Sequence, residues 1–516
     1  MSQQKCLLAA LVAALLVLGA VPAGAAPAVA CDNRTNNTYE KLLECVTVEG
    51  VREHQAAFQA IADANGGNRA AGLPGYEASV DYVVDRLEAA GWNVTLDEFP
   101  FTFQLVTLTQ ITPVTASYQT VSATGSGFGD VTGNVIAVDL VLTPPRDPAT
   151  SGCEAADFAG LDFTGPSDIA LVQRGTCNFS DKALNAQVAG AEAVVIMNQG
   201  NTPDREGLFG ATLGTFVAAI PVVTASFADG ANLAQPGSTA RVQVTEPESR
   251  PQVNVIAELP GDNDDNVVMA GAHLDSVQAG PGINDNGSGS AVLLEVAEQI
   301  SKLKPENTLR FAWWGAEEDG LIGSSEYVFG LSEAELDRIA LYLNFDMVGS
   351  PNYVFMVYDS DQSSYAAPVP VPAGSVAIED LFESFFTLLG EPYDDAEFSG
   401  RSDYQAFILR GVPAGGLFTG AEIIKTAEQQ AIWGGTVGAQ FDPCYHLVCD
   451  TFGNVSTHAL GVNADAIAAA VLTYAYSTET VNGEPGEEVP GNFSFPVPAG
   501  AEGTCAGGGG TAVCQP

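Results

Sequence analysis

The sequence predicts an α/β fold in which a mostly parallel mixed sheet is flanked by helices and interrupted by an inserted, mainly β domain. After Val253, strand-like apolar runs alternate with segments of helical periodicity, an order typical of a parallel sheet covered by helices. From about Pro113 to Glu248, by contrast, short apolar runs are separated by Gly, Pro and Asp. The 516 residues, 46% hydrophobic and 16% charged, are enough for two or more domains with their own cores.

The first 30 residues are expected to be a secretory signal peptide. Lys5 precedes an apolar run from Leu7 to Val21, and small residues then lead to the cleavage-like motif Ala28-Val29-Ala30. This run is shorter than the apolar segment that a transmembrane helix needs. We also expect no later segment to be long and apolar enough to cross a bilayer. A soluble, secreted protein is the consequence.

The predicted helices and strands follow from side-chain periodicity. Residues 76–90 carry apolar side chains at helical spacing, and Gly91 follows as a C-terminal stop. Residues 94–109 are rich in β-branched and aromatic side chains, which favours strands. Within the insert, only residues 182–193 have a helical period. Beyond the insert we expect strands at 267–272, 308–314 and 339–347 and helices at 289–303, 332–338 and 376–389.

These elements divide the chain into five parts. We expect the signal peptide at 1–30, the first part of the α/β domain at 31–114, the insert at 115–250, the remainder of the α/β domain at 251–477, and a low-complexity tail of Gly, Pro, Glu and Ser at 478–516. No internal repeat is visible in the sequence.

Cysteine usage agrees with an oxidising compartment. Nine cysteines are present and Cys6 leaves with the signal peptide, so an even number of eight remains. Many connectivities are possible. An alternative fate for Cys31 is lipidation of the N-terminus, but Ala28 stands where such a signal usually has Leu. Pairing of neighbours along the chain would give Cys31–Cys45, Cys153–Cys177, Cys444–Cys449 and Cys505–Cys514.

Acidic residues dominate the charge of the chain. Sixty-three Asp and Glu face 19 Lys and Arg, which gives a net charge of −44. Nucleic acids and anionic membranes are bound through clustered Lys and Arg, so both partners are excluded. We expect most of the acids to be surface charge that keeps a secreted protein soluble.

Candidate metal ligands follow three of the predicted strands. Ligands gather at the carboxyl ends of strands in α/β sheets, and acids buried there without partners would cost several kcal/mol and repel one another. One or two divalent cations would remove that conflict, and imidazole combined with carboxylate suits zinc. The candidates are His273 and Asp275 in GAHLDS, Asp285 in GINDNGSG, Glu317 and Glu318 in WWGAEEDG, and Asp346 in LNFDMVG.

Each of these motifs also has an ordinary interpretation. A lone H-x-D or Glu-Glu pair is usually a solvated face, Asp285 fits a turn, and Asp346 fits a helix N-cap. Their position at successive strand ends of one domain favours a common site. Among the other histidines, His446 lies in the loop DPCYHLVCDT, whereas His54 in a polar helix and His458 at the start of another are expected on the surface.

The same segments carry a resemblance to a known family. In order and type, GAHLDS, GINDNGSG, WWGAEE, NFDMVGS, GRSDYQAF, GGLFTG and CYHLVCD resemble the secreted di-zinc aminopeptidases, which include bacterial leucine aminopeptidases and aminopeptidase Y, over about residues 253–476. The insert resembles a protease-associated domain through DIALVQRGTCNFSDKALNAQVAGAEAVVIMNQ. The resemblance implies the zinc exopeptidase fold and a secreted zinc aminopeptidase that removes hydrophobic, leucine-like N-terminal residues.

The resemblance also implies which residues hold the metal. His273 and Asp346 would bind one zinc ion, and Glu318 and His446 would bind a second. The carboxylate of Asp285 would bridge the two ions.

Further residues receive catalytic and binding roles from the same resemblance. Asp275 would orient the first imidazole, and Glu317 would be the general base that takes a proton from the metal-bridging water. Tyr445 would hold the developing oxyanion. Arg401 would lie near the substrate and Phe418 would line the side-chain pocket. The expected partners are peptide or protein N-termini, acted on by a monomer.

Two alternative functions use a similar fold. Glutaminyl cyclase or carboxypeptidase chemistry is one, but the cyclase type holds a single zinc ion, so the presence of both His273 and Asp346 argues against it. A metal-deficient, receptor-like binding protein is the other, and the complete ligand set argues against it. Calcium occurs in some relatives, but no complete ligand set is visible here: Gly461 stands where an acid would be expected after the CYHLVCD loop, although Asp465 remains.

Overall fold

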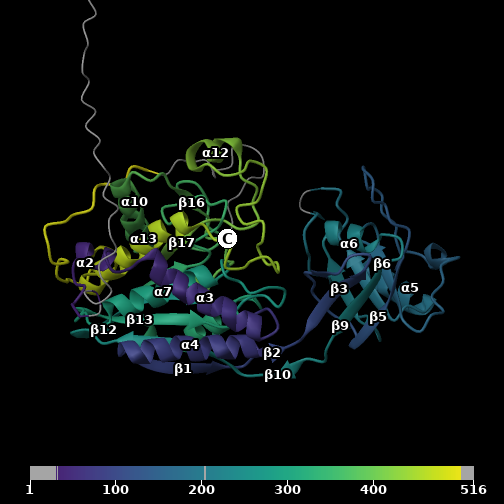
Figure 1. The fold of residues 1–516 in the computed structure, drawn as a ribbon, viewed down its shortest axis with the longest axis horizontal. Helices are drawn as coiled ribbons and strands as arrows, with labels where there is room; N and C mark the ends of the chain where they lie inside the picture. Colours follow the sequence, from purple (N-terminus) through teal and green to yellow (C-terminus); the bar gives the residue numbers. More distant parts are fainter. Residues whose placement is uncertain (1–30, 32, 203–204, 501–516) are drawn as a thin grey trace, which may run out of the picture.

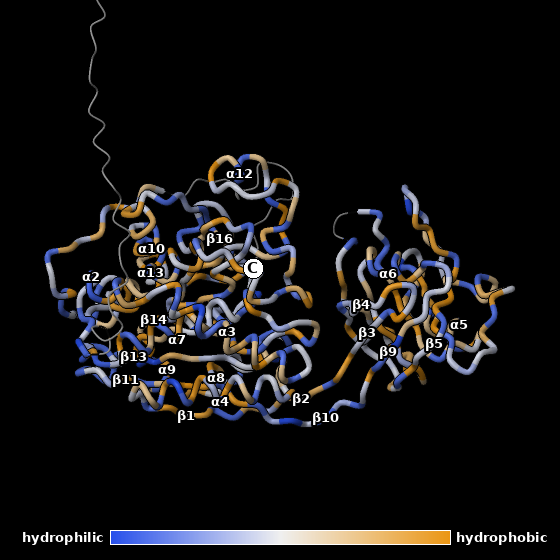
Figure 2. Tube along the Cα trace, viewed as in Figure 1, coloured by the Kyte–Doolittle hydropathy of each residue, from blue (hydrophilic) through white to orange (hydrophobic). Residues whose placement is uncertain are grey.

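The described part of the chain forms two bodies (Figure 1). The computed structural model describes residues 31, 33–202 and 205–500; the expected signal peptide and the expected Cys505–Cys514 disulfide lie outside them. Figure 1 shows the two bodies connected by two short strands, β2 (Thr102–Phe103) and β10 (Glu248–Ser249), which pair antiparallel. Each body has separate hydrophobic clusters, and in Figure 2 the hydrophobic residues gather inside each one.

The larger body is built on an eight-stranded mixed sheet, which confirms the predicted fold class. Its strand order is β1-β11-β13-β12-β14-β17-β15-β16. The central strands β13, β12, β14 and β17 are parallel, β15 and β16 are parallel to each other, and the remaining neighbours are antiparallel. The strands are β1 (Asn93–Phe99), β11 (Gln252–Leu259), β12 (Asn263–His273), β13 (Asn307–Trp314), β14 (Ile339–Phe345), β15 (Met356–Tyr358), β16 (Asp394–Ala396) and β17 (Ala414–Phe418).

Helices cover this sheet, and the most deeply placed is α7 (Gly287–Ile300). Its apolar side chains are buried almost all round, and the Asn286 side chain caps its first turn by accepting a hydrogen bond from the Gly289 N–H. The other helices of this body are α2 (Tyr39–Leu43), α3 (Val48–Ala64), α4 (Pro74–Ala90), α8 (Ile322–Gly330), α9 (Glu333–Leu336), α10 (Ser375–Leu389), α11 (Tyr404–Leu409), α12 (Ala427–Trp433), α13 (Thr457–Tyr476) and α14 (Glu479–Asn482).

Two expectations about this body are wrong. His54 is 1% exposed instead of lying on the surface, because α3 packs against both α4 and α7. In the part of the chain that the structure describes, α13 is long and apolar enough to cross a membrane, contrary to the prediction that no later segment is. Of its most apolar window, 78% is buried inside the body, which is the behaviour of a core helix.

The insert forms the smaller body around a seven-stranded sheet that includes residues 106–112, so it starts earlier than the expected residue 115. Its strand order is β4-β3-β9-β5-β6-β7-β8, and its described residues also include a short 3₁₀ helix, Ala155–Phe158, and the helices α5 and α6. The predicted helix at 182–193 ends too late, because Gly190 has φ 107° and closes α5. The elements are β3 (Val106–Thr112), β4 (Ala116–Tyr118), β5 (Gly129–Ala137), β6 (Asp168–Gln173), α5 (Phe179–Ala189), β7 (Ala193–Met197), β8 (Val222–Ala225), α6 (Phe227–Leu233) and β9 (Thr239–Val244).

Among the described residues, three disulfides close local loops, as neighbour pairing predicts. They join Cys31 to Cys45, Cys153 to Cys177 and Cys444 to Cys449. Disulfides of this kind indicate an oxidising compartment.

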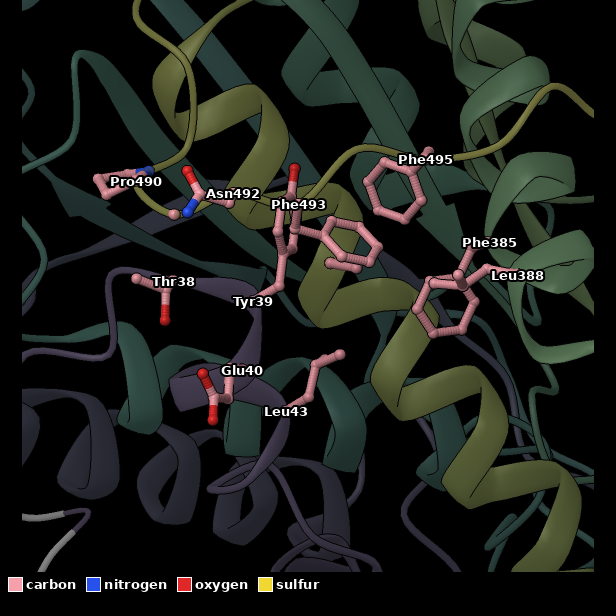
Figure 3. Close-up of a pocket in the computed structure, with 12 residues that line it drawn as sticks. Thr38, Tyr39, Glu40, Leu43, Phe385, Leu388, Pro490, Asn492, Phe493 and Phe495 are labelled. Atoms are coloured by element: carbon pink, nitrogen blue, oxygen red, sulfur yellow. The ribbon is translucent and has the colours of Figure 1, made fainter.

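The described part of the C-terminal tail lies against the larger body. The rings of Phe493 and Phe495 have their centroids 5.0 and 5.2 Å from that of Tyr39 on α2. Together with residues of α10 and α13 they line a pocket of about 410 Å³ (Figure 3). Further along, the Ala499 N–H donates to Thr387 Oγ1 at 2.9 Å.

Candidate metal centre

The carboxyl ends of three neighbouring strands bring the first candidate residues together. His273 ends β12, whose parallel neighbours are β13, followed by Glu317, and β14, followed by Asp346. The His273 Nε2 atom lies 3.2 Å from Asp285 Oδ1, 3.4 Å from Asp346 Oδ1 and 3.9 Å from Glu317 Oε2. These four side chains are buried, so they share one small volume at the edge of the sheet.

A second imidazole completes the cluster from the loop closed by the Cys444–Cys449 disulfide. The His446 Nε2 atom lies 2.9 Å from Glu318 Oε2 and 3.1 Å from Asp285 Oδ2. Asp285 therefore directs one oxygen to each histidine. The result is two donor groups that share a single carboxylate.

The donor atoms of this cluster fit a metal. Glu318 Oε1 and Asp346 Oδ1 are buried without a hydrogen-bond partner among the described residues. Such orphaned acceptors cost free energy unless something positive binds them. Imidazole nitrogen with carboxylate oxygen is the donor set that zinc prefers.

The electrostatics of the two imidazoles support the same conclusion. Burial lowers the pKa of His273, but the Glu317 and Asp346 carboxylates outweigh burial and hold that pKa well above its usual value. For His446, burial likewise lowers the pKa, and Glu318 with Asp285 raises it well above the usual value. The carboxylates therefore create a strongly negative potential at the two imidazoles, which attracts cations.

Backbone strain accompanies the cluster. Ala316, immediately before Glu317, has φ 54°, and Met347, immediately after Asp346, has φ 49°. His446 itself has φ 57°. Residues other than glycine rarely adopt this left-handed conformation, and it persists where the surrounding structure enforces it, often at functional sites.

Asp275 lies beside the His273 ring and also accepts backbone hydrogen bonds from the loop after β13. Its Oδ1 lies 3.7 Å from His273 Nδ1, and its own backbone carbonyl oxygen lies 3.2 Å from that nitrogen. The carboxylate also accepts the backbone N–H groups of Glu317 at 3.2 Å and Glu318 at 3.3 Å. Asp275 thus connects the end of β12 to the two acids that follow β13.

Sequence reasoning missed two residues that hold the loop carrying Asp285. The buried guanidinium of Arg69 donates to the carbonyl oxygens of Leu274, Pro281 (2.9 Å) and Gly282 (2.7 Å). The Asp450 carboxylate accepts the N–H of Asp285 at 3.0 Å. Arg69 lies 212 residues before Pro281, beyond the insert, so no local pattern could have connected them.

The GRSDYQAF segment contributes a further pair that was not predicted. Ser402 Oγ donates to Asp346 Oδ2 at 2.6 Å, which fixes that carboxylate. Asp403 is buried beside it, and burial raises the pKa of Asp403 to about 7. The motif itself was a signal for both, since they directly follow Arg401.

The remaining candidates lie at the edge of the cluster. The Tyr445 ring stacks on His446 with centroids 3.8 Å apart, and Arg401 donates to Tyr445 Oη at 3.2 Å and to Glu422 at 2.9 Å. Phe418 ends β17 and is buried at 1% exposure.

Comparisons with known proteins agree with this geometry. Residues 254–471 match the profile of peptidase family M28, and residues 131–233 match the PA domain. The chain is 45% identical over 454 residues to an aminopeptidase of Pseudomonas aeruginosa, covering 86% of this chain and 84% of that protein. It is 40% identical over 448 residues to leucine aminopeptidase 2 of Trichophyton equinum, covering 85% and 86%. A probable lipoprotein aminopeptidase, LpqL, of Mycobacterium tuberculosis is 42% identical over 477 residues, covering 90% of each chain.

Solved structures give the same result. The aminopeptidase from Aneurinibacillus sp. strain AM-1 superposes with a TM-score of 0.53 at 30% identity, covering 89% of this chain and 99% of that one. A zinc aminopeptidase from Bacillus subtilis gives a TM-score of 0.56 at 25% identity, covering 82% and 94%.

Proposed function

The chain belongs to peptidase family M28 and is a metallo-aminopeptidase, and from this premise we propose that it is secreted and removes N-terminal hydrophobic residues at a centre of two zinc ions. The observation that carries the proposal is the pair of donor groups sharing Asp285, with His273 on one side and His446 on the other. The name of the Trichophyton relatives, leucine aminopeptidase, supports the hydrophobic preference.

In this proposal His273 and Asp346 would hold one zinc ion, Glu318 and His446 would hold the other, and Asp285 would serve both. When bound, the two ions supply Lewis acidity for the scissile carbonyl and make a water molecule acidic at neutral pH. Hydrogen bonds keep the ligands and their loops in place. Ser402 donates to the Asp346 carboxylate and Arg69 donates to carbonyl oxygens of the loop before Asp285, whereas Asp275 and Asp450 accept backbone N–H groups of Glu317, Glu318 and Asp285.

Glu317 is the proposed general base. It lies next to the ligand Glu318 but is farther from His273 Nε2 than either Asp285 or Asp346. Burial raises the pKa of Glu317 well above its usual value, which makes its carboxylate a strong proton acceptor. It can take a proton from the attacking water and return it to the leaving amine, as peptide hydrolysis requires.

Tyr445 is proposed to stabilise the oxyanion that forms at the scissile carbonyl. Because Arg401 donates to its oxygen, the phenolic O–H of Tyr445 stays available to donate elsewhere. A donor aimed at the developing negative charge lowers the barrier to acyl transfer.

The acids of the centre also explain a preference for free N-termini. A protonated α-amine is positive, and the acids Glu317 and Asp346 of the centre can accept hydrogen bonds from it. An internal peptide bond offers no such charge. We therefore propose exopeptidase action on peptide and protein N-termini.

A substrate panel tests this function. The purified protein is expected to release leucine from a leucyl amide, to lose that activity after chelation, and to regain it when zinc is added back. N-acetylleucyl amide is the matched substrate without the charge, and it should remain intact. Cleavage of the acetylated substrate, or of C-terminal residues from amine-blocked peptides, would contradict the proposal.

A further inference from the structure

A second cluster of metal-ligand side chains lies between α3, α4 and α7. His54 Nε2 on α3 faces two acids of α7, at 3.6 Å from Glu295 Oε2 and 4.0 Å from Glu298 Oε2. His54 Nδ1 lies 2.8 Å from Tyr82 Oη of α4. Glu295 is eight residues into α7, about 12 Å along the helix from its first residue, so this cluster is separate from the candidate metal centre.

The unpartnered nitrogen is the observation that points to a ligand. His54 is buried, yet its Nε2 has no hydrogen-bond partner among the described residues. The separations from the two carboxylates exceed the usual N–H···O range of about 2.7–3.2 Å. They resemble the distances between imidazole and carboxylate atoms in the candidate metal centre, which run from 2.9 Å for His446–Glu318 to 3.9 Å for His273–Glu317.

The charges around this nitrogen are also unbalanced. Arg86 binds Glu298 through two hydrogen bonds of 2.5 and 2.8 Å and contacts Glu53 at 3.1 Å. Buried Glu295, among the described residues, accepts from the neutral Gln299 amide at 3.2 Å. Three carboxylates against one guanidinium leave two negative charges when His54 is neutral, which is the charge that one divalent cation offsets.

The helix backbone makes room for this arrangement. A Cβ atom at Gly50 of α3 would lie 2.4 to 2.6 Å from the carboxylate atoms of Glu295. Because residue 50 is a glycine, the Glu295 carboxylate can lie directly against α3 and face His54. The site is also reachable, since the Glu298 side chain is 18% exposed.

We propose that His54, Glu295 and Glu298 bind a zinc ion that joins α3 to α7. One imidazole and two carboxylates form a donor set suited to zinc, and water entering beside Glu298 would supply a further ligand. Donation from the Nδ1–H of His54 to Tyr82 Oη leaves the Nε2 lone pair free for the ion. The site assists the fold and takes no part in peptide hydrolysis.

Zinc counting on matched variants tests the proposal. The mature protein is stripped with a chelator, reloaded with Zn²⁺, desalted and measured by mass spectrometry of the metal. The variants His54→Asn and Glu295→Gln should each hold one zinc ion fewer than the parent protein. Asn is chosen because its amide lies near the position of His54 Nδ1 and can keep the contact with Tyr82. His458→Asn is the control, because that histidine also faces an acid, Glu391 at 3.7 Å, but is 55% exposed. It should hold as much zinc as the parent.

A second measurement does not depend on the variants folding. Crystals of the zinc-loaded parent protein should give an anomalous difference peak bonded to His54 Nε2 and Glu295 Oε2. Equal zinc counts in the parent protein and its three variants, or no anomalous peak at this position, would overturn the proposal. His54 and Glu295 would then share a proton instead of a zinc ion. Peaks at the candidate metal centre, next to His273 and His446, are observed independently of a peak at His54. Absence of zinc at one of these two sites therefore does not affect the conclusion about the other.

Discussion

Glu317 lies beside the candidate metal centre and is proposed to move protons there. We expect Glu317→Gln to lower kcat for a leucyl amide by about 10²–10⁴-fold, because the amide cannot accept the proton of the attacking water. KM and zinc content should change little, since Glu317 is not a proposed ligand. Steady-state kinetics with metal analysis checks this, and Glu88→Gln on the exposed face of α4 is the control. Unchanged turnover would remove Glu317 from this role.

Three acids, Glu379 and Glu383 of α10 and Asp395 of β16, are expected to affect the pH dependence of stability. Burial raises the pKa of Glu379 to about 9, of Glu383 to about 7 and of Asp395 to about 6. A glutamate in the unfolded chain has a pKa of about 4.3. Between about pH 5 and 9 these three acids therefore bind more protons in the folded protein than in the unfolded chain, so their contribution to stability falls as the pH rises.

Glu379→Gln should remove much of this dependence. The amide oxygen can still accept the N–H groups of Ser360 and Asp361, which lie 3.0 and 2.9 Å from the carboxylate, but it carries no charge. The difference in unfolding free energy between variant and parent should therefore be more favourable to the variant at pH 8.5 than at pH 5.5, by about 1 kcal/mol or more. Urea unfolding at the two pH values measures it. Parallel pH profiles for parent and variant would show that Glu379 does not cause the dependence.

At the scale of single residues, the sequence could predict the candidate ligands that follow strands. It could not predict the residues whose hydrogen bonds hold the ligand-bearing loop in place. His273, Glu318 and Asp346 directly follow apolar runs, so their position at the sheet edge could be deduced. Arg69 and Asp450 act across long separations in the chain, and nothing near them marks a partner. The polar sequence around His54 predicts a surface position, although packing against two other helices buries it.

Among the elements, the tail shows how a low-complexity segment can be ordered by a few aromatic rings. Phe495 lies within ring-contact distance of both Tyr39 and Phe385, with centroids 5.2 and 6.4 Å apart. Each such pair contributes about 0.5–1.5 kcal/mol. Tail residues around Phe495 therefore gain their order from contact with α2 and α10.

Replacing Phe493 and Phe495 by Ala should detach residues 486–500 from α2 and α10. Backbone amides of residues 486–500 are expected to exchange faster with deuterium, while the central strands keep their protection, because only local contacts are lost. Val497→Ala is the control from the same segment, since Val497 is 85% exposed and contributes little packing. Equal exchange in both variants would show that other contacts hold the tail.

Element types were predicted more reliably than their ends. The strand expected at 339–347 stops at Phe345, because Met347 takes a left-handed φ of 49° that a strand cannot contain. That conformation is imposed by neighbours in the folded body, so the local sequence does not reveal it. Gly190, by contrast, was a readable stop for α5, and the predicted helix extended past it.

At the scale of the molecule, the insert can be removed at a defined place. Phe103 and Glu248 are opposite each other in the β2–β10 pair, so a two-residue Asn-Gly turn fits between them. We expect a protein in which Asn-Gly replaces residues 104–247 to fold and to hydrolyse leucyl amide, since the candidate metal centre lies wholly in the larger body.

The same deletion tests what the insert does. If it restricts access to the centre, the deleted form should hydrolyse large, structured N-termini faster relative to leucyl amide than the parent does. Competition assays with a small amide and a folded protein substrate give this ratio. An unchanged ratio would mean that the insert has no part in substrate selection.

The pairing of β1 with β11 has a consequence for how the chain folds. These antiparallel neighbours are hydrogen-bonded from Asn93–Glu258 to Phe99–Gln252, so they form a hairpin whose loop is an entire domain. Closing a long flexible loop costs entropy that grows with its length. Once the insert has collapsed into its own body, its two ends meet at β2 and β10, and that closure is already complete. Early folding of the smaller body thus makes β1 and β11 effectively near neighbours for the larger one.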